Sequence, residues 1–270
     1  AVGVVAAVMA AAVAVLGGLL ASVDLSASPD GDGGAAMGSG AMFDAIAGNY
    51  DLVNKVISLG GDVAWRRQLV AALELQPGHR VLDLATGTAD VAIMIGREAT
   101  APEVVGVDPS NNMLSIGRQK VKDAGLGTSV ELFQGDAQSL DGYGDSSFDS
   151  VSMSFGIRNV PDRDVALREM VRVVRPGGKV AILEFSDPHE GILAPLARLF
   201  VRHVVPRVGA LMSGARAEYV HLQNSIANFP LPDEFANGMT RAGLEVEKPR
   251  MIHPGGVYLY VSAVPAAAAA

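Results

Sequence analysis

Short apolar runs of strand length alternate with helix-length segments through the middle of the chain. Three of these segments have the length of helices, at residues 90–98, 111–124 and 163–174. The apolar runs between them are expected to form strands, at residues 81–84, 104–107, 130–133, 148–153 and 180–185. Alternation of this kind predicts a mostly parallel sheet with helices on both faces.

Turn signals continue the pattern toward the C-terminus. Arg175-Pro176-Gly177-Gly178 ends the third helical segment and leads into the run at 180–185. Two further runs, at 244–247 and 257–263, are separated by a Pro/Gly turn at Pro254-Gly255-Gly256. We therefore predict an α/β fold with a seven-stranded, mostly parallel sheet that closes with a terminal hairpin.

The first 23 residues carry no charge. As a helix they would extend roughly 35 Å, enough to cross the roughly 30 Å core of a bilayer. We predict a membrane anchor at residues 1–25. No basic residue precedes Lys55, so the sequence sets no orientation for this helix. A remnant targeting segment and a helix buried against a partner stay as alternatives.

The remaining boundaries follow from composition. Residues 26–41 are rich in Gly, Ser and Asp and lack an apolar period, which is typical of a flexible linker. Residues 42–265 are predicted to form one domain, and residues 266–270 an alanine tail.

Charge and cysteine content exclude several functions. The 21 Lys and Arg residues against 29 Asp and Glu give a net charge of −8, which argues against nucleic-acid binding. Five of the acids and no base lie in the first 54 residues, so the rest of the chain is nearly balanced. No Cys is available for disulfides, metal ligation or a thiol nucleophile. The five His residues show no H-x-x-x-H pairing, and we expect no metal site.

Acidic and small residues follow the first two predicted strands. Asp83 stands at the end of the first strand, and Gly87 lies in the loop after it, where small residues let a ligand approach the backbone. Asp108 ends the second strand, 21 residues after Gly87, where a carboxylate can accept hydrogen bonds from ribose hydroxyls. The pattern predicts a nucleoside-binding edge.

The missing glycines indicate which nucleoside cofactor this edge binds. A pyrophosphate needs G-x-G-x-x-G, but only Gly87 fits here, between Thr86 and Ala89, which disfavours a nicotinamide oxidoreductase. S-adenosylmethionine has no phosphate and needs fewer glycines. Asp136, after the third strand, adds an acceptor for the adenine amino group. We expect S-adenosylmethionine, with a plain βα turn as the alternative.

A basic amphipathic stretch lies between residues 191 and 217. It holds four Arg residues and no acid, interleaved with Leu, Val, Phe and Met. Such a stretch can rest on an anionic lipid surface. An ordinary helix packed on the sheet, a lid and a dimer face are the alternatives.

Five stretches carry a more specific signal. They are YDLVN at 50–54 with Ser58 and Trp65, SFGIRNV at 154–160, RVVRPGGK at 172–179 continuing to 184–186, RHVVPRVG at 202–209, and SIANFP at 225–230. With them the chain resembles the ubiquinone/menaquinone biosynthesis C-methyltransferase family of class I methyltransferases, from about residue 42 to 261. The resemblance implies a Rossmann-like fold and a prenylated quinol precursor as the methyl acceptor.

The resemblance also implies which residues contact the methyl donor. These are Thr88, Asp108, Asp136, Ala137 and Ser154, and we expect Asp83, Gly87 and Met113 to complete the site. Three positions depart from the family pattern. Asp62 stands where His is usual, Val53 where Met is usual, and Ala89 where Gly is usual. The methyl group of Ala89 leaves open whether it crowds the methionine moiety.

Methylation of a ring carbon needs an electron-rich ring, which a quinol becomes when one hydroxyl loses its proton. Arg158 suits the stabilisation of the phenolate, because its guanidinium stays protonated; for the same reason it is a poor base, and a water polarised beside it is the alternative. Asn159 is expected to orient the ring oxygen, and Tyr50 to hydrogen-bond the same edge. Alternatively, Arg158 anchors a helix start through Asp162 or Asp164, and Tyr50 only packs.

The sequence therefore predicts S-adenosylmethionine-dependent C-methylation of a prenylated quinol precursor of ubiquinone, menaquinone or phylloquinone. The predicted anchor and basic stretch favour a lipid membrane, in an organelle such as the plastid thylakoid or the mitochondrial inner membrane. The alternative is a methyltransferase-fold structural subunit of a membrane complex with weak or no activity, motivated by the anchor together with Asp62 and Ala89. A homodimer is also compatible with the pattern.

Overall fold

The computed structural model describes residues 40–58, 60–98, 102–187, 194–199, 216–253 and 256–266. The anchor predicted at 1–25, nearly all of the linker and most of the basic stretch lie outside this part of the chain. Among the helices of the described residues, none combines the length and apolarity needed to cross a membrane.

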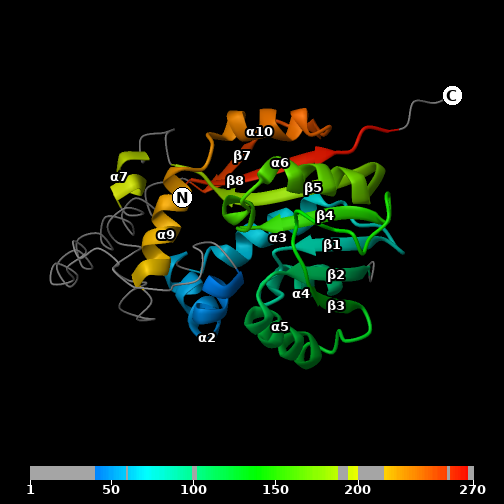
Figure 1. The fold of residues 1–270 in the computed structure, drawn as a ribbon, viewed down its shortest axis with the longest axis horizontal. Coiled ribbons are helices and arrows are strands. Elements are labelled where there is room, and N and C mark those ends of the chain that lie inside the picture. Colours follow the sequence, from blue (N-terminus) through cyan, green and yellow to red (C-terminus); the bar gives the residue numbers. More distant parts are fainter. Residues whose placement is uncertain are drawn as a thin grey trace.

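A mixed sheet forms the centre of the fold (Figure 1). Its strands are β1 (Arg80–Leu84), β2 (Glu103–Asp108), β3 (Val130–Gln134), β4 (Phe148–Ser154), β5 (Val174–Phe185), β6 (Glu245–Val246), β7 (Arg250–His253) and β8 (Val257–Ala263). The order is β3-β2-β1-β4-β5-β8-β6, with β7 also paired to β8. Strands β1 to β5 pair in parallel, and β8 runs antiparallel to β5, β6 and β7. The mostly parallel α/β sheet predicted from the sequence is confirmed.

The predicted number of seven strands is wrong, because the described residues form eight. The additional strand is β7, whose apolar run is only Met251 and Ile252. A run of two residues is too short to stand out as a strand in the sequence. It forms a strand because it pairs with β8, through Arg250 and Met251.

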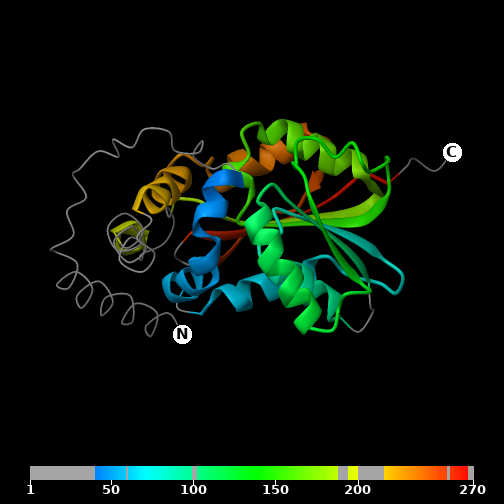
Figure 2. The ribbon, with the colours of Figure 1, turned by 60° about the horizontal axis from the view of Figure 1, so that its bottom comes forward.

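Helices cover both faces of the sheet (Figure 2). One face carries α3 (Asp62–Ala72), α4 (Asp90–Gly96) and α5 (Asn111–Asp123), and the other carries α6 (Arg163–Val173) and α10 (Pro232–Arg241). Successive strand residues point to opposite faces, so Leu82 packs in the core under α6 and α10 while Val81 packs in the core under α3 to α5.

Two further helices stand at the carboxyl ends of the parallel strands. They are α2 (Gly40–Ile57), which contacts α5, and α9 (Arg216–Ala227), which contacts the short helix η1 (Ile157–Asn159) after β4. Both views place α2 and α9 side by side at this end (Figures 1 and 2). A short helix, α7 (Ala194–Leu199), precedes α9. Helix α2 begins at Gly40, inside the range predicted as linker.

Candidate active site

A cavity of about 310 Å³ opens at the carboxyl ends of β1, β2 and β4. Strand order reverses at β1, which lies between β2 and β4, and open α/β sheets bind ligands at such a switch point. Gly40, Phe43 and Tyr50 of α2 form one wall of this cavity. We call it the donor cavity.

Asp108 lines the donor cavity, where it accepts hydrogen bonds from two backbone amides. Its Oδ2 accepts a hydrogen bond from the Gly87 amide at 2.8 Å, and its Oδ1 accepts one from the Ser110 amide at 2.8 Å. A carboxylate has about four lone-pair sites, so capacity remains for two hydroxyls of a ribose. Burial raises the pKa of Asp108 to about 6, although both backbone hydrogen bonds act in the opposite direction.

Polar and apolar groups line the rest of the donor cavity. Ser154 Oγ is buried and has no hydrogen-bond partner within the described residues. Asp136 and Ala137 lie in the loop after β3, and Met113 lies in the first turn of α5. Two carboxylates, one unpaired hydroxyl and apolar walls suit a positively charged nucleoside without phosphate. The residues present therefore fit S-adenosylmethionine.

Asp83 does not line the donor cavity. Its Oδ1 accepts a hydrogen bond from Ser152 Oγ at 2.7 Å, and its Oδ2 accepts one from Thr86 Oγ1 at 2.6 Å. Burial raises the pKa of Asp83 to about 6, and the two hydroxyl hydrogen bonds partly oppose that rise. Asp83 thus holds the loop after β1 in shape from beneath.

The methyl group of Ala89 also lies outside the lining of the donor cavity. Ala89 is fully buried and belongs to the hydrophobic cluster between α4 and α5 that includes Leu114. A Cβ built at Gly117 would lie 3.2 Å from the Ala89 Cβ, so the methyl group faces α5. The methyl group therefore lies toward Gly117 of α5 and is not part of the cavity lining. Ala89 adopts a left-handed φ of 67°, which explains why glycine suits the position.

A smaller pocket of about 40 Å³ adjoins the donor cavity, and Phe43, Tyr50 and Asn159 line both. We call it the side pocket. Its apolar walls come from α2 and α9, and its polar lining residues include Arg158 and His221. Burial raises the pKa of Tyr50, and the nearby positive charge of Arg158 partly opposes that rise. Tyr50 also packs edge-on against Phe43, so it both packs and lines the site.

Arg158 is held by a buried ion pair. Its Nη1 donates to Glu184 Oε1 at 2.6 Å and to the Phe155 carbonyl at 2.8 Å, and its backbone amide donates to Glu184 Oε2 at 3.2 Å. The two side chains are 6% and 0% exposed. Its Nε is buried without a partner among the described residues. The sequence left open that Arg158 anchors the start of a helix through Asp162. Asp162 instead caps α6, where it accepts a hydrogen bond from the Val165 amide.

Asn159 pairs with a residue that the sequence did not single out. His221 Nε2 lies 3.1 Å from Asn159 Oδ1, across the side pocket. Burial lowers the pKa of His221, and the positive charge of Arg158 lowers it further. The two residues are 62 positions apart, so no local spacing in the sequence could have indicated the pair.

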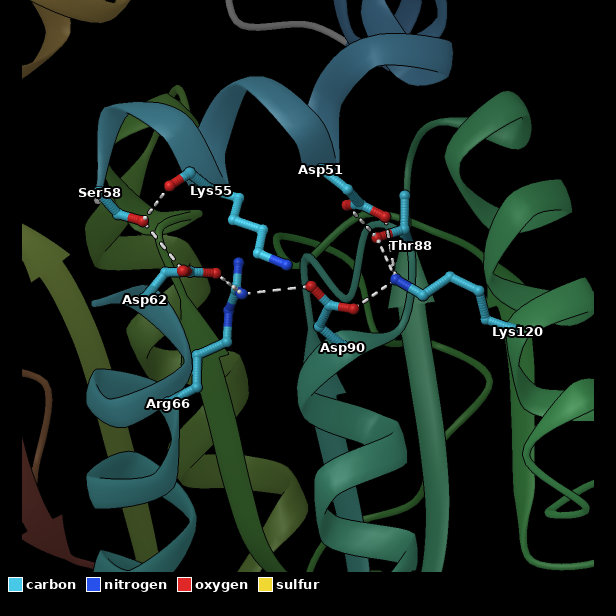
Figure 3. Close-up of polar contacts among 8 residues, drawn as sticks. All are labelled: Asp51, Lys55, Ser58, Asp62, Arg66, Thr88, Asp90 and Lys120. Atoms are coloured by element: carbon cyan, nitrogen blue, oxygen red, sulfur yellow. Dashed lines mark hydrogen bonds and ion pairs between the residues drawn. The ribbon is translucent and has the colours of Figure 1, made fainter. Parts of the chain in front are cut away.

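Thr88 lies outside the donor cavity lining and belongs to a polar network (Figure 3). Its Oγ1 donates to Asp51 Oδ1 at 2.7 Å and accepts from Lys120 Nζ at 3.1 Å. Lys120 also forms ion pairs with Asp51, at 3.0 Å, and with Asp90. The network therefore joins α2 to the loop after β1, to α4 and to α5.

Asp62, which stands where the family usually has His, lies in the same network (Figure 3). It accepts hydrogen bonds from Ser58 Oγ at 2.9 Å and from Arg66 Nη1 at 2.6 Å. Arg66 Nη1 also lies 3.2 Å from Asp90 Oδ2, which links Asp62 to the rest of the network. The departure at Asp62 is thus accommodated by a cation beside it.

A second contact fixes the other end of α2. Asp44 Oδ1 accepts hydrogen bonds from Ser110 Oγ at 2.5 Å and from the Asn112 amide at 2.8 Å, at the start of α5. Asp44 and Asp51 therefore hold α2 in place beside the donor cavity from both sides of Tyr50.

The structure brings most of the predicted site residues together. Those lining the donor cavity are Tyr50, Gly87, Asp108, Met113, Asp136, Ala137, Ser154 and Asn159. Arg158 lines the side pocket, while Asp83 and Thr88 support the loop from outside. Within the part of the chain that the structure describes, no group of three or more His, Asp or Glu side chains could hold a metal ion.

Comparison with known proteins gives a consistent result. Residues 36–262 match the model of the ubiE/COQ5 methyltransferase family. The demethylmenaquinone methyltransferase of Deinococcus radiodurans is 44% identical over 202 residues, which cover 75% of this chain and 83% of that protein. The ubiquinone/menaquinone biosynthesis C-methyltransferase UbiE of Geotalea daltonii is 40% identical over 205 residues, covering 76% of this chain and 86% of that protein.

Solved structures support the fold alone. A SAM-dependent methyltransferase from Aquifex aeolicus superposes with a TM-score of 0.54 at 17% identity, covering 74% of this chain and 89% of that one. A SAM-dependent methyltransferase from Thermotoga maritima, described as a possible histamine N-methyltransferase, gives a TM-score of 0.56 at 20% identity, with coverages of 82% and 97%.

Proposed function

The chain belongs to the ubiE/COQ5 methyltransferase family and is an S-adenosylmethionine-dependent methyltransferase of quinone biosynthesis, and we propose that its acceptor is a prenylated naphthoquinol. The relatives named demethylmenaquinone methyltransferase support the naphthalene ring. The observation that carries the proposal is the junction of the donor cavity with a side pocket that holds Arg158.

Several residues would hold the cofactor. Asp108 would accept from the ribose hydroxyls, Asp136 from the adenine amino group, and the unpaired Ser154 hydroxyl would gain a partner. When bound, S-adenosylmethionine supplies a methyl group on a positively charged sulfur, which keeps the bonding electron pair on departure. The two carboxylates favour that positive charge in a cavity that also has apolar walls.

The side pocket supplies the groups that a quinol oxygen requires. The guanidinium of Arg158 stays protonated and lines the side pocket, so it can stabilise negative charge on a ring oxygen there. Glu184 holds the guanidinium in place through its buried ion pair with Nη1. Only the reduced ring has an ionisable hydroxyl, so the proposal requires a quinol and not a quinone.

The intact site bears on the alternative function as a structural subunit. A subunit that only fills space in a complex has no need for an open cavity with a buried, unpaired hydroxyl at Ser154. Ala89, one motive for that alternative, faces α5. Asp62, the other, has a matched cation in Arg66. The site therefore favours the enzyme.

Membrane association is part of the proposal. It rests on the uncharged residues 1–23 and on the four Arg residues of the stretch at 191–217. The organelle predicted from the sequence stays a prediction. Flotation of the full chain with anionic vesicles, compared with a chain beginning at residue 40, tests the contribution of the N-terminal segment.

A binding and turnover experiment tests the function. Calorimetry should detect S-adenosylmethionine and its demethylated product, and methyl transfer should occur to demethylmenaquinol kept reduced under anaerobic conditions. Oxidised demethylmenaquinone and a prenylated benzoquinol are the matched acceptors. Absence of cofactor binding would refute the enzyme, and faster transfer to the benzoquinol would refute the naphthoquinol.

A further inference from the structure

His221 of α9 lines the side pocket, next to η1. It is partly buried, and its Nε2 lies 3.1 Å from Asn159 Oδ1. Asn159 also lines the donor cavity, so this pair stands where the two pockets meet. The function proposed above gives the pair no role in the reaction.

The contact with Asn159 favours one tautomer of His221. A side-chain amide oxygen can only accept, so the contact is a hydrogen bond in the tautomer that carries its proton on Nε2. In a neutral imidazole the other nitrogen, Nδ1, then has a free lone pair. His221 therefore presents a proton acceptor rather than a donor.

We propose that His221 is the base that removes the proton from the ring hydroxyl of the acceptor, with Asn159 as the positioning residue that orients its imidazole. This inference rests on the proposed function, because it assigns a role within the same site. In the step, the O–H bond of the quinol breaks, its electron pair stays on oxygen, and the proton forms an N–H bond at Nδ1. The resulting imidazolium releases the proton to solvent before the next cycle.

The other titratable groups around the pocket are unsuited to this task. Arg158, from η1, stays protonated and is engaged by Glu184 of β5. Burial raises the pKa of Tyr50, from α2, so its hydroxyl stays neutral and is not a base at pH 7. Among the described residues lining the side pocket, His221 is left as the titratable side chain with a free lone pair at neutral pH.

The charges around His221 favour its neutral form. Burial lowers the pKa of His221 below its ordinary 6.5, and the positive charge of Arg158 lowers it further. The imidazole is therefore unprotonated at pH 7 and ready to accept a proton. The same guanidinium stabilises the phenolate oxygen that the proton leaves, so one cation acts on both partners of the transfer.

Replacing His221 by Gln tests the proposal through turnover. Gln keeps an amide N–H for Asn159 but has no basic nitrogen, so kcat at pH 7 should fall roughly 10²–10⁴-fold. The Kd for S-adenosylmethionine should change less than about twofold, because His221 does not line the donor cavity. Exogenous imidazole should restore part of the kcat of the His221→Ala variant. The matched control is His79→Gln, at the opposite end of β1, which should match the wild-type chain.

The pH profile separates a base from a structural residue. In the wild-type chain, kcat should rise with pH through the lowered pKa of His221 and then level off. In His221→Gln, kcat should continue to rise toward the pKa of the quinol hydroxyl, which resembles that of a phenol at about 10. Equal pH profiles in the two chains, with equal kcat, would overturn the proposal.

A readout without turnover distinguishes this inference from the proposed function. In ¹⁵N-histidine NMR at pH 7, the His221 signals should show an unprotonated Nδ1 that shifts when 1-naphthol is added with the demethylated cofactor product. A protonated Nδ1, or no shift, would overturn the role of His221 even in an active enzyme. A shift on 1-naphthol binding in a chain that methylates no quinol would instead support His221 as the acceptor contact and refute the proposed function.

Discussion

The hydroxyl of Thr88 donates a hydrogen bond of 2.7 Å to Asp51 Oδ1, which ties the loop after β1 to helix α2. The loop carries Gly87 of the donor cavity, and the helix carries Tyr50 of both pockets. Two elements that are 37 residues apart in the chain are thereby held as one unit.

Replacing Thr88 by Val removes this link while keeping the shape of the side chain. One hydrogen bond of this kind contributes about 0.5–1.5 kcal/mol, so the Kd for S-adenosylmethionine should rise roughly two- to tenfold. Amide hydrogen exchange in α2 should become faster at the same time. Thr240→Val is the control, because Thr240 lies on α10 and its hydroxyl donates to the Ala236 carbonyl of the same helix. An unchanged Kd together with unchanged exchange in α2 would contradict the proposed link.

Replacing Asp108 by Asn removes a charged acceptor from the donor cavity. Hydrogen bonds to charged groups contribute about 1.5–3 kcal/mol, so affinity for S-adenosylmethionine should fall roughly 10- to 100-fold. Burial raises the pKa of Asp108 to about 6, so the wild-type affinity should itself decrease as the pH falls through 6 and the carboxylate is protonated. Calorimetry across roughly pH 5 to 8 should show a shallower pH dependence in the Asn variant.

The same raised pKa values affect the stability of the fold. Burial raises the pKa of both Asp83 and Asp108 from 3.8 to about 6. Because both values are raised, the two groups contribute stability that is fully present below 3.8 and is lost as the pH rises through 6. Asp108→Asn should therefore weaken this part of the pH dependence of the free energy of unfolding, measured by urea titration. An unchanged pH dependence would contradict the assignment.

Replacing Arg66 by Met leaves Asp62 buried without its cation. Side chains in this pair are only 9% and 11% exposed, and removal of one partner from a buried pair costs about 3–5 kcal/mol of the free energy of unfolding. The control is Arg80→Met, whose ion pair with Glu103 is 38% and 57% exposed and should cost about 1 kcal/mol or less. Equal losses for the two variants would show that Arg66 and Asp62 do not act as a buried pair.

Replacing Ala89 by Gly should leave the Kd for S-adenosylmethionine within about twofold, because the removed methyl group faces α5. Gly117→Ala should instead lower the free energy of unfolding by about 1–3 kcal/mol through overpacking. Its new Cβ would lie 2.9 Å from Leu132 Cδ1 and 3.2 Å from the Ala89 Cβ. In the double variant, Ala89→Gly should restore part of that loss. A strictly additive pair would contradict the contact.

The parts of the fold and site that could be predicted are those set by local pattern. Apolar runs identified the core strands, and parallel strands bring their carboxyl ends to one edge, which placed Asp108, Asp136 and Ser154 around one cavity. The edge strand β7 was not predicted, because its apolar run is too short to be distinguished from a loop. Its strand character comes from pairing with β8 and not from its own sequence.

The partners of the predicted residues could not be read from the sequence. Glu184 lies 26 positions after Arg158, and only the pairing of β4 with β5 brings it beneath η1. Thr88 matched a cofactor contact by its position in the loop, yet its hydroxyl is taken by Asp51. His221 depends on the placement of α9, which no periodicity in the chain specifies. Long-range packing decides these contacts, and local spacing does not record it.

Helix α2 forms a wall of both the donor cavity and the side pocket, and Asp44 and Asp51 fix it on the core. A ligand in either pocket contacts this same helix, so we expect donor and acceptor to be coupled in their binding free energies. Because such coupling is reciprocal, the factor by which the cofactor raises affinity for the quinol equals the factor by which the quinol raises affinity for the cofactor.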